Sequence, residues 1–315
     1  MVNKAKNIKQ TILELLYREN GHTISGVKIS KATGISRVAV WKHIAALKQI
    51  GFAIDSGPNG YALAHPEDLM LPCCFDPCVR EHIHHFQEVE TTMDTAKCLA
   101  REGAPHLSCV VAEHQTKGRG RLNREWVSAR GGLWFTLILK PPEPPPLVYI
   151  YNFAASLSLS RVLNQLFNVD ISVKWPNDLL LKKKKLSGML SEMETRGDMV
   201  QFLAIGIGIN VNNDPANKDF KAISLKNVLK KKVSRKQILT AFLLEFKNTI
   251  HNMNGPKIIA QWKEQTSTIG SRVRVETFDS FYEGKAVDVD ETGALIIEDD
   301  QQKRKKIIYG DCFHT

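Results

Sequence analysis

The feature that most limits the fold of this chain is a largely apolar run, FLAIGIGINV, at residues 202–211. The run is about half of the ~20 residues that a helix needs to cross a bilayer, so it predicts a buried strand of a globular domain. Gly206 and Gly208 stand at alternate positions, and alternate residues of a strand face the same side of its sheet. We therefore expect a central strand with a flat strip on one face, which suits a flat ligand laid against the sheet.

The composition allows several domains and favours anionic partners. A chain of 315 residues is long enough for two or three domains with a sizeable core. Lysine and arginine number 43 against 33 aspartates and glutamates, and the net charge of +10 suits nucleic acids, nucleotides or acidic proteins. The first residues, MVNKAKNIKQ, lack the apolar core of a signal peptide, and the six cysteines are irregularly spaced. We expect a cytoplasmic protein with reduced thiols and no membrane contact.

A group of cysteines and histidines lies in the segment PCCFDPCVREHIHH, residues 72–85. A tetrahedral zinc site could be assembled from them, since thiolates and imidazoles are the usual zinc ligands. The segment has no CxxC pair and no second pair at zinc-ribbon spacing, which favours a linker with a short amphipathic helix. The members of the group are Cys73, Cys74, Cys78, His82, His84 and His85.

The first sixty residues predict three helices and a hairpin. The first helix begins near Ile8 and ends at Gly21, while Ser25 and Ser36 are placed to cap the second and third. Two short strands are expected around a turn at residues 57–60. The apolar positions of the second helix are Val27, Ile29 and Ala32, and those of the third are Val40, Ile44 and Leu47.

This order of elements is typical of a winged helix-turn-helix, which lays its third helix in the major groove of DNA. The same apolar pattern would also hold together a three-helix protein-interaction module. The basic outer face of the third helix and the Pro-Asn-Gly wing favour DNA binding. The residues expected to contact DNA are Ser36, Arg37, Lys42, His43 and Asn59.

The central part of the chain predicts a mixture of strands and helices. Strands are expected at residues 108–115 and 131–139, and a long helix at residues 147–167. The sequence EVETTMDTAK ends a strand and starts a helix, where short polar side chains lie beside free backbone amides. KWPND forms a rigid turn, and LLL and SGMLSEM predict paired strands with a lysine run at their junction.

The stretch KGRGRLNREW, residues 117–126, follows neither the helical nor the strand period. It can be a solvated basic loop or an arginine–glycine tract that touches RNA phosphates. Alternatively, its backbone amides and guanidinium groups close over an anion. Lys185 stands apart from the lysine run because it enters a KLSG sequence, whose Gly188 permits close backbone approach.

The motifs KGRGRLNREW, KWPNDLLL, KLSGMLSE and GIGINVN, in that order behind a winged helix, resemble the bacterial bifunctional biotin–protein ligases and biotin operon repressors. The YGDCFHT ending matches that family as far as Asp311. The resemblance implies an α+β fold with a class II synthetase-like mixed sheet, substrates biotin and ATP with Mg²⁺, and biotinyl-5′-AMP as intermediate. It also implies the biotin carboxyl carrier protein and operator DNA as partners, and a homodimer that forms with ligand.

The resemblance also implies the residues of the site. Lys185, Arg119 and Arg121 are the expected catalytic cations, because joining a carboxylate to the α-phosphate of ATP brings two anions together. Trp126 is expected to stack on adenine, while Asp178 either helps to place Mg²⁺ or is a structural turn carboxylate. The expected biotin ligands are Thr91, Thr92, Met93, Gln115, Arg119, Gly120, Arg121, Lys185 and Gly188. The expected ATP or adenylate ligands are Gly118, Arg124, Trp126, Lys174, Asn177, Gly206, Gly208 and Asn210.

A small β-barrel is expected at the C-terminus. Ser234 caps a helix that stops at Gly255-Pro256, and alternating residues after Gly270 predict strands. The expected domains are a winged helix at 1–65, a linker at 66–85, a catalytic domain at 86–268 and the barrel at 269–315. Two alternatives remain, a lipoate-type ligase of the same fold and a ligand-responsive repressor without catalysis.

Overall fold

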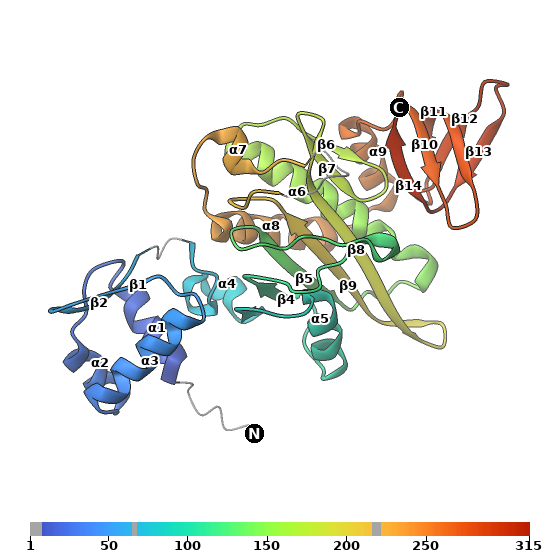
Figure 1. Ribbon diagram of the computed structural model, residues 1–315. Coiled ribbons are helices and arrows are strands. Elements are labelled where there is room, and N and C mark those ends of the chain that lie inside the picture. Colours follow the sequence, from blue (N-terminus) through green and yellow to red (C-terminus); the bar gives the residue numbers. More distant parts are fainter. Residues whose placement is uncertain (1–7, 65–67, 216–221) are drawn as a thin grey trace. The chain divides into compact units, whose positions relative to one another are not determined.

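The computed structural model describes residues 8–64, 68–215 and 222–315. The chain divides after Glu81 into two compact units, of which the first contains α1 to α4 and the second β3 to β14 (Figure 1). The domain boundary expected at residues 65 and 66 lies outside the described residues. In the part of the chain that is described, no helix combines the length and the apolar character that crossing a membrane requires.

The first unit is a three-helix bundle with a hairpin. Its elements are α1 (Ile8–Arg18), α2 (Gly26–Thr33), α3 (Arg37–Gln49), β1 (Ile54–Gly57), β2 (Gly60–Leu63), η2 (Pro72–Cys74) and α4 (Pro77–Arg80). Ser25 and Ser36 cap α2 and α3 as predicted, each accepting a hydrogen bond from a backbone amide of the first turn at 3.2 Å. The antiparallel strands β1 and β2 form the predicted wing.

The core of this unit confirms most of the predicted apolar face. Val40, Ile44 and Leu47 of α3 are buried, and so is Ile29 of α2. Val27 and Ala32 of α2, by contrast, are exposed, because they lie on the outer side of the helix. Leu71 and Cys74 join the same core, so part of the segment predicted as a linker packs against the first unit.

A seven-stranded mixed sheet forms the centre of the second unit, in the order β3-β4-β5-β9-β8-β7-β6. Its strands are β3 (Ile83–Phe86), β4 (Ser108–Ala112), β5 (Leu133–Leu139), β6 (Ile171–Lys174), β7 (Asp178–Leu181), β8 (Lys184–Arg196) and β9 (Met199–Ile209). Only the β3–β4 pair of this sheet is parallel. The apolar run with alternate glycines is the predicted interior strand, β9, between β5 and β8.

Helices cover both faces of this sheet (Figure 1). Helix α5 (Thr92–Arg101) packs Met93 and Ala96 against Ile138 and Ala204 on one face. The other face carries Phe135, whose ring meets Phe242 of α8 at 5.4 Å between centroids. The helices of that second layer are α6 (Ile150–Phe167), α8 (Arg235–His251) and α9 (Gly255–Gln265). A short α7 (Leu225–Leu229) lies between β9 and α8.

The C-terminal region differs from the prediction in two ways. Gly255-Pro256 was expected only to stop a helix, yet Asn254 caps a further helix there, because proline fits the first helical turn. The expected barrel is an open five-stranded antiparallel sheet, ordered β13-β12-β11-β10-β14. Its edge strands, β13 and β14, are not hydrogen-bonded to each other, so the sheet does not close. The strands are β10 (Arg272–Glu276), β11 (Phe281–Val289), β12 (Leu295–Glu298), β13 (Arg304–Ile307) and β14 (Asp311–His314).

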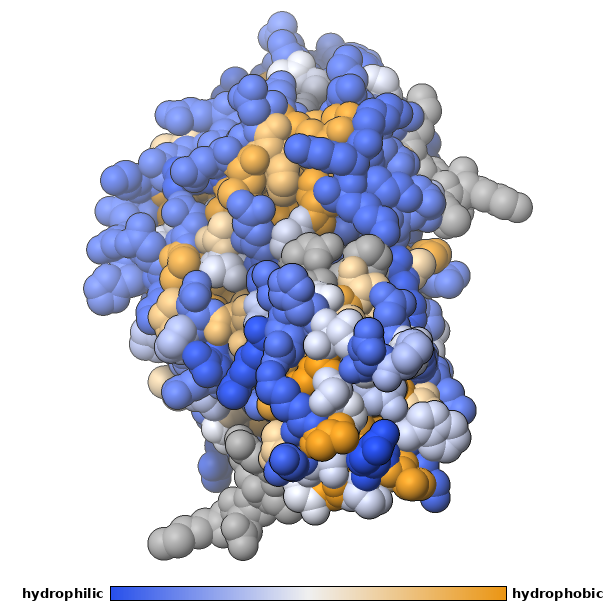
Figure 2. Space-filling model, turned by 90° about the vertical axis from the view of Figure 1, so that its left-hand side faces the viewer, coloured by the Kyte–Doolittle hydropathy of each residue, from blue (hydrophilic) through white to orange (hydrophobic). Residues whose placement is uncertain are grey.

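Polar residues dominate the face of the molecule drawn in Figure 2. On the face drawn in Figure 2, hydrophilic residues cover most of the area and hydrophobic residues gather in separate patches between them. The large hydrophobic side chains that stay exposed include Val38 and Trp41 of α3 and Phe278 and Ile308 of the C-terminal sheet. Such side chains contribute little to the core and are candidates for contacts with partners.

Candidate active site

A cavity of about 360 Å³ lies against the face of the sheet that α5 covers. The strip predicted on β9 forms part of its floor, since Gly206 and Gly208 both line it. The other predicted site residues that line the cavity are Thr91, Thr92, Met93, Gln115, Arg119, Gly120, Arg121, Arg124, Trp126, Lys174, Asn177, Asp178, Lys185 and Gly188. Segments far apart in the sequence therefore converge on one cavity, as the motifs implied.

One end of the cavity is neutral and polar. The backbone amide of Thr92 donates to the Gln115 side-chain carbonyl at 2.7 Å, and the Thr92 hydroxyl donates to the same oxygen at 3.0 Å. Thr136 of β5 in turn donates to the Thr92 hydroxyl at 2.9 Å, and Gln115 donates to Ser128 at 2.7 Å. A connected set of hydroxyl and amide groups of this kind can exchange hydrogen bonds with a polar, uncharged ligand group.

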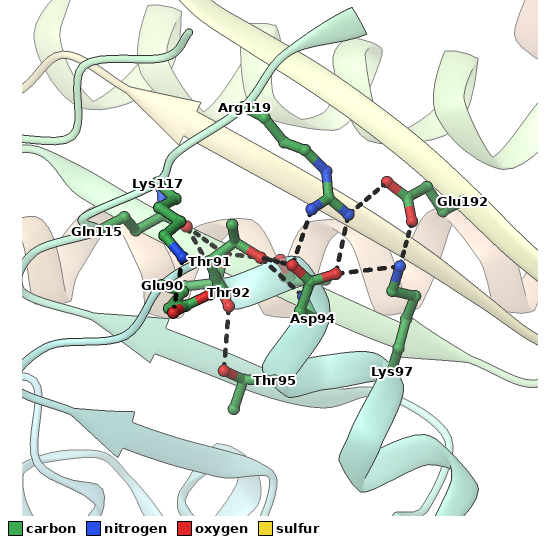
Figure 3. Close-up of polar contacts among 11 residues, drawn as sticks. Glu90, Thr91, Thr92, Asp94, Thr95, Lys97, Gln115, Lys117, Arg119 and Glu192 are labelled. Carbon is green, nitrogen blue, oxygen red and sulfur yellow. Dashed lines mark hydrogen bonds and ion pairs between the residues drawn. The ribbon is translucent and has the colours of Figure 1, made fainter. Parts of the chain in front are cut away.

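A network of charged side chains fixes the loop of residues 117–126 (Figure 3). Arg119 donates to both oxygens of Asp94, at 2.8 and 2.9 Å, and to Glu192 of β8 at 3.0 Å. Lys97 lies 3.1 Å from Asp94 and 2.6 Å from Glu192. The Arg119 guanidinium holds the pKa of the Asp94 carboxyl well below its ordinary value. Arg119, predicted as a ligand cation, lines the cavity, and in this structure its ion pairs with two carboxylates fasten the loop to α5 and β8.

Trp126 lies over the glycine strip at the centre of the cavity. A Cβ atom built on Gly208 would lie 2.6 Å from its indole nitrogen, and one on Gly188 would lie 3.1 Å from the ring. The indole nitrogen is buried and has no hydrogen-bond partner among the described residues. The flat strip therefore holds an aromatic side chain, which leaves one hydrogen-bond donor available to a ligand.

The other end of the cavity is rich in cations. Lys185 lies 2.8 Å from Asp178, and its ammonium is 5.3 Å from the Trp126 ring centroid. Arg124 lies 2.7 Å from Asp311 of β14. Arg121 is 3.9 Å from Asp311, and one of its terminal nitrogens is buried without a hydrogen-bond partner among the described residues. The lining carries six lysines and arginines against three aspartates and glutamates, an excess that suits a phosphate.

Arg121 is more buried than a solvated basic loop, one of the alternatives for residues 117–126, would leave it. A basic residue in a polar loop is expected to be exposed, but only 23% of this side chain is exposed. Burial lowers the pKa of the guanidinium from its ordinary value, since a low dielectric disfavours the charged form. A partly desolvated cation interacts with an anion more strongly than one in water.

Two predicted ligands lie outside the cavity lining. A Cβ atom on Gly118 would lie 2.3 Å from the carbonyl oxygen of Trp126, so this glycine allows the loop to fold back on itself. Asn210 is buried and its side-chain carbonyl accepts a hydrogen bond from Asn213 at 2.8 Å. Both positions stabilise the local backbone in this structure.

Several lining residues were missed by the sequence reasoning. Thr136 lies inside an apolar strand and gave no signal of its own. Trp175 and Pro176 are joined by a cis peptide bond in the predicted rigid turn, and both line the cavity. The remaining group is β14, whose Asp311, Cys312, Phe313 and His314 reach the cavity from the end of the chain. The partial match of YGDCFHT to the family's ending was the available signal.

The donor set of the cavity bears on metal binding. In the described part of the chain, no group of three or more histidine, cysteine, aspartate or glutamate side chains is placed to hold a metal ion. The cavity does present Asp178 and Asp311, each beside a cation. Mg²⁺ commonly uses one or two carboxylates together with substrate phosphates, so these two oxygens fit a metal carried in by a nucleotide.

The first unit presents the predicted DNA-contacting residues on its surface. Arg37 and Lys42 of α3 and Asn59 of the wing are exposed, while His43 is partly buried. Ser36 is exposed as well, and its hydroxyl caps α3. Neither α2 nor α3 contains an acidic residue, so the charged side chains of these two helices are all basic.

Three family models match the chain. Residues 9–62 match an HTH domain, residues 86–210 match the Biotin/lipoate A/B protein ligase family, and residues 268–315 match the Biotin protein ligase C terminal domain. Their order along the chain is the order of the helix-turn-helix, the cavity-bearing sheet and the C-terminal sheet.

Two known proteins illustrate the similarity in sequence. The chain is 32% identical over 315 residues to the Bifunctional ligase/repressor BirA of Bacillus subtilis, covering 95% of this chain and 96% of that protein. It is 32% identical over 198 residues to the Biotin--[acetyl-CoA-carboxylase] ligase of Mycobacterium tuberculosis, covering 60% of this chain and 72% of that protein.

A solved structure agrees with these relatives. The biotin protein ligase from Aquifex aeolicus, in complex with biotin and ATP, superposes with a TM-score of 0.64 and 28% identity, covering 74% of this chain and 99% of that chain. The match to the Bacillus subtilis protein extends over nearly the whole of both sequences, winged helix included. The chain therefore belongs to the family of bifunctional biotin–protein ligases and repressors.

Proposed function

We propose that this chain activates biotin with ATP, transfers it to a lysine of an acceptor protein, and binds operator DNA when the activated intermediate is bound. The observation that carries the proposal is a cavity with a neutral polar end and a cationic end, joined by an aromatic side chain. Biotin has a polar ureido ring at one end and a carboxylate at the other, and this division matches the two ends of the cavity.

The ureido ring belongs at the polar end. Thr92 and Gln115 are already hydrogen-bonded to each other, which fixes their side chains before a ligand arrives. Fixed groups lose little conformational freedom on binding, and this favours affinity. The biotin carboxylate then points toward Lys185 and Arg121.

Activation joins two anions at the cationic end. A biotin carboxylate oxygen attacks the α-phosphorus of ATP, the bond to the bridging oxygen breaks, and pyrophosphate leaves. Lys185 and Arg121 offset the negative charge of the carboxylate and of the phosphate oxygens as they approach. Lys185 is held by Asp178 at 2.8 Å, so little reorganisation is required when the charge develops.

Transfer consumes the mixed anhydride. The deprotonated amine of the acceptor lysine attacks the biotinyl carbonyl carbon, the C–O bond to AMP breaks, and AMP leaves with the electron pair. The loop of residues 117–126 lies over the cavity, which keeps water from the anhydride until the acceptor arrives. We further propose that Mg²⁺ enters with ATP beside Asp178 or Asp311, where it would neutralise phosphate charge.

The enzymatic proposal is tested by incubating the chain with biotin, ATP, Mg²⁺ and a biotin carboxyl carrier domain. Mass spectrometry should show a gain of one biotinyl group on one acceptor lysine. Replacing biotin by lipoate in the same assay distinguishes a biotin ligase from a lipoate-type ligase. The matched control is an acceptor in which that lysine is changed to arginine. No transfer by folded protein would contradict the ligase proposal, and biotin binding without pyrophosphate exchange would favour a non-catalytic repressor.

The regulatory proposal rests on the basic face of the first unit. A chain that begins at His82 should retain ligase chemistry and lose DNA binding, since the catalytic cavity lies wholly in the second unit. His82 is a better starting point than residue 66, because Leu71 and Cys74 belong to the core of the first unit. A truncated chain that folds but has no ligase activity would show that the units are not separable.

We also propose that ligand binding promotes a homodimer. A ligand that orders loops at an interface removes part of the entropy cost of association. Sedimentation of the full chain with and without biotin and ATP tests this. A mass that doubles only with both substrates supports the proposal, and a ligand-independent mass contradicts it.

A further inference from the structure

The outward face of α3 carries two large apolar side chains that the fold does not use. Val38 is 64% exposed and Trp41 is 59% exposed, while Val40, Ile44 and Leu47 of the same helix are buried. Residues three and four positions apart share a helical face, so Val38, Trp41 and the partly buried Ala45 form one outward stripe. The core of the unit therefore does not explain why these positions are apolar.

Cations border this stripe on both sides. At about 100° per residue, Arg37 and Lys48 lie along one edge of it and Lys42 along the other. All three basic side chains are exposed. No acidic residue occurs in α3 or in α2, so the charged side chains that these two helices contribute beside the stripe are all positive.

The chemistry of the stripe selects one kind of partner. It fits a polyanion that presents small apolar groups at the floor of a groove wide enough for a helix. The major groove of duplex DNA, about 12 Å wide, has phosphates along its edges and the C5 methyl group of thymine on its floor. An acidic protein would match the charge, but the matching HTH domain and the wing favour DNA.

We propose that Val38 and Trp41 read thymine methyl groups in the major groove, an inference that rests on the proposed DNA-binding function. The two residues are about 4.5 Å apart along the helix axis, close to the ~3.4 Å between base pairs, so they contact neighbouring pairs. Arg37, Lys42 and Lys48 then contact the phosphates on either side. The polar residues Ser36, His43 and Asn59 contribute hydrogen bonds, whereas the apolar stripe determines which base pairs are preferred.

The test uses the full-length chain with biotin, ATP and Mg²⁺. Duplexes are selected from a randomised library, and each thymine of the selected duplex is then replaced in turn by uracil, which lacks only the C5 methyl group. One or two of these replacements should weaken wild-type binding about fourfold, the equivalent of ~0.8 kcal/mol for one buried methyl group. Val38→Ala and Trp41→Ala should each bind the thymine and uracil forms equally at one of those positions.

Val27→Ala is the matched control. Val27 is 43% exposed on α2, so the same change is made on the same unit away from the stripe, and discrimination between thymine and uracil should persist. Helical circular dichroism and ligase activity confirm that each variant is folded. Wild-type binding that is indifferent to every uracil replacement overturns the inference alone. Failure to select any duplex overturns the regulatory proposal as well. If Trp41→Ala changes self-association and leaves DNA binding unchanged, the stripe is a protein contact and the inference is overturned.

Discussion

At the scale of single residues, carboxylates hold the cations of the cavity in place. Lys185 is paired with Asp178 and Arg124 with Asp311, at 2.8 and 2.7 Å. A cation fixed in this way needs little rearrangement when negative charge develops near it. The pairs also limit repulsion among several positive charges in the cavity before the nucleotide binds.

Replacing Lys185 by alanine should slow biotin-dependent pyrophosphate exchange by roughly a hundredfold or more, the scale of losing one preorganised electrostatic group. The free energy of unfolding should change little, because the Lys185 side chain is partly exposed. Its partner, the Asp178 carboxylate, is also partly exposed and can be solvated after the replacement. Lys184→Ala is the control, since it removes an exposed lysine from the same run. Equal exchange rates for the two variants would contradict the role of Lys185.

Arg121→Ala should release biotinyl-5′-AMP faster than the wild type. The side chain is partly desolvated beside Asp311, and its buried nitrogen has no hydrogen-bond partner in the described residues, so an anion can occupy that position. Rapid dilution of preloaded protein followed by quantification of free adenylate measures the release rate. Arg130→Ala, an exposed arginine beyond the loop, is the control. An unchanged release rate would show that Arg121 does not retain the intermediate.

The sequence predicted which residues gather in the cavity better than it predicted what each one does. Gly206 and Gly208 predicted a flat strip because the alternation of side chains between the two faces of a strand depends only on neighbouring residues. That Trp126 lies on this strip, and that carboxylates neutralise Arg119, depend on contacts between distant segments. Spacing along the chain contains no information about such contacts.

At the scale of elements, the loop of residues 117–126 is attached to α5 and β8 by the ion pairs of Arg119 with Asp94 and Glu192 (Figure 3). A second pair, Lys117–Glu90, lies at the start of the same loop and is largely exposed. Partly buried, bidentate pairs are worth more than exposed ones. The Arg119 pairs therefore determine how firmly the loop covers the cavity.

Combining Asp94→Asn with Glu192→Gln should loosen this loop. We expect faster cleavage of the loop by trypsin and a several-fold faster loss of the adenylate. The free energy of unfolding should change little. Glu90→Gln, which removes only the exposed pair, should behave as the wild type. If trypsin cleaved the loop of the double variant no faster than that of the wild type, and the adenylate was lost at the same rate, the ion pairs would have no part in closing the loop.

Elements with local signals were predicted well, and those that depend on tertiary contacts were not. The caps Ser25, Ser36 and Ser234 were identified because a serine side chain bonds an amide of the next turn. Helix α9 was missed because Pro256 is equally suited to stop one helix and to start another. The open C-terminal sheet depends on strand pairing, which a single hairpin signal does not specify.

At the scale of the whole molecule, a buried ion cluster joins the sheet of the second unit to α8. Glu113, which follows β4, lies 3.2 Å from His85 of β3 and 2.7 Å from Arg235 of α8. Burial alone would raise the pKa of the Glu113 carboxyl, but the hydrogen bond from His85 and the charge of Arg235 outweigh it and lower the pKa to about 2. Removing one member of such a cluster leaves a buried charge without a partner.

This cluster predicts how stability depends on pH. The folded pKa of Glu113 is below its ordinary value of 4.5, so its contribution is complete above that pH and is lost as the pH falls toward about 2. The loss should reach about 3 kcal/mol, since one pKa unit corresponds to ~1.4 kcal/mol. Urea unfolding at stepped pH, followed by near-ultraviolet circular dichroism, measures it. Glu113→Gln should be less stable at pH 7 and show a smaller decline, and an unchanged decline would contradict the assignment.

The order of motifs predicted a regulatory and a catalytic unit, and the division after Glu81 falls within the linker expected at residues 66–85. Residues 72–80 form η2 and α4, in line with the short helix expected there, and Cys74 of this segment is buried against the first unit. Burial of this kind depends on the shape of the unit that receives the segment. A sequence pattern does not specify the shape of that unit.

The most direct measurement is a crystal structure of the chain grown with biotin and ATP. We expect biotinyl-5′-AMP in the cavity, with its ureido ring within hydrogen-bond distance of Thr92 or Gln115 and its phosphate within that distance of Lys185 or Arg121. Density for the adenylate at another site, or in this cavity with the ureido ring among the cations and the phosphate beside Thr92, would contradict the account.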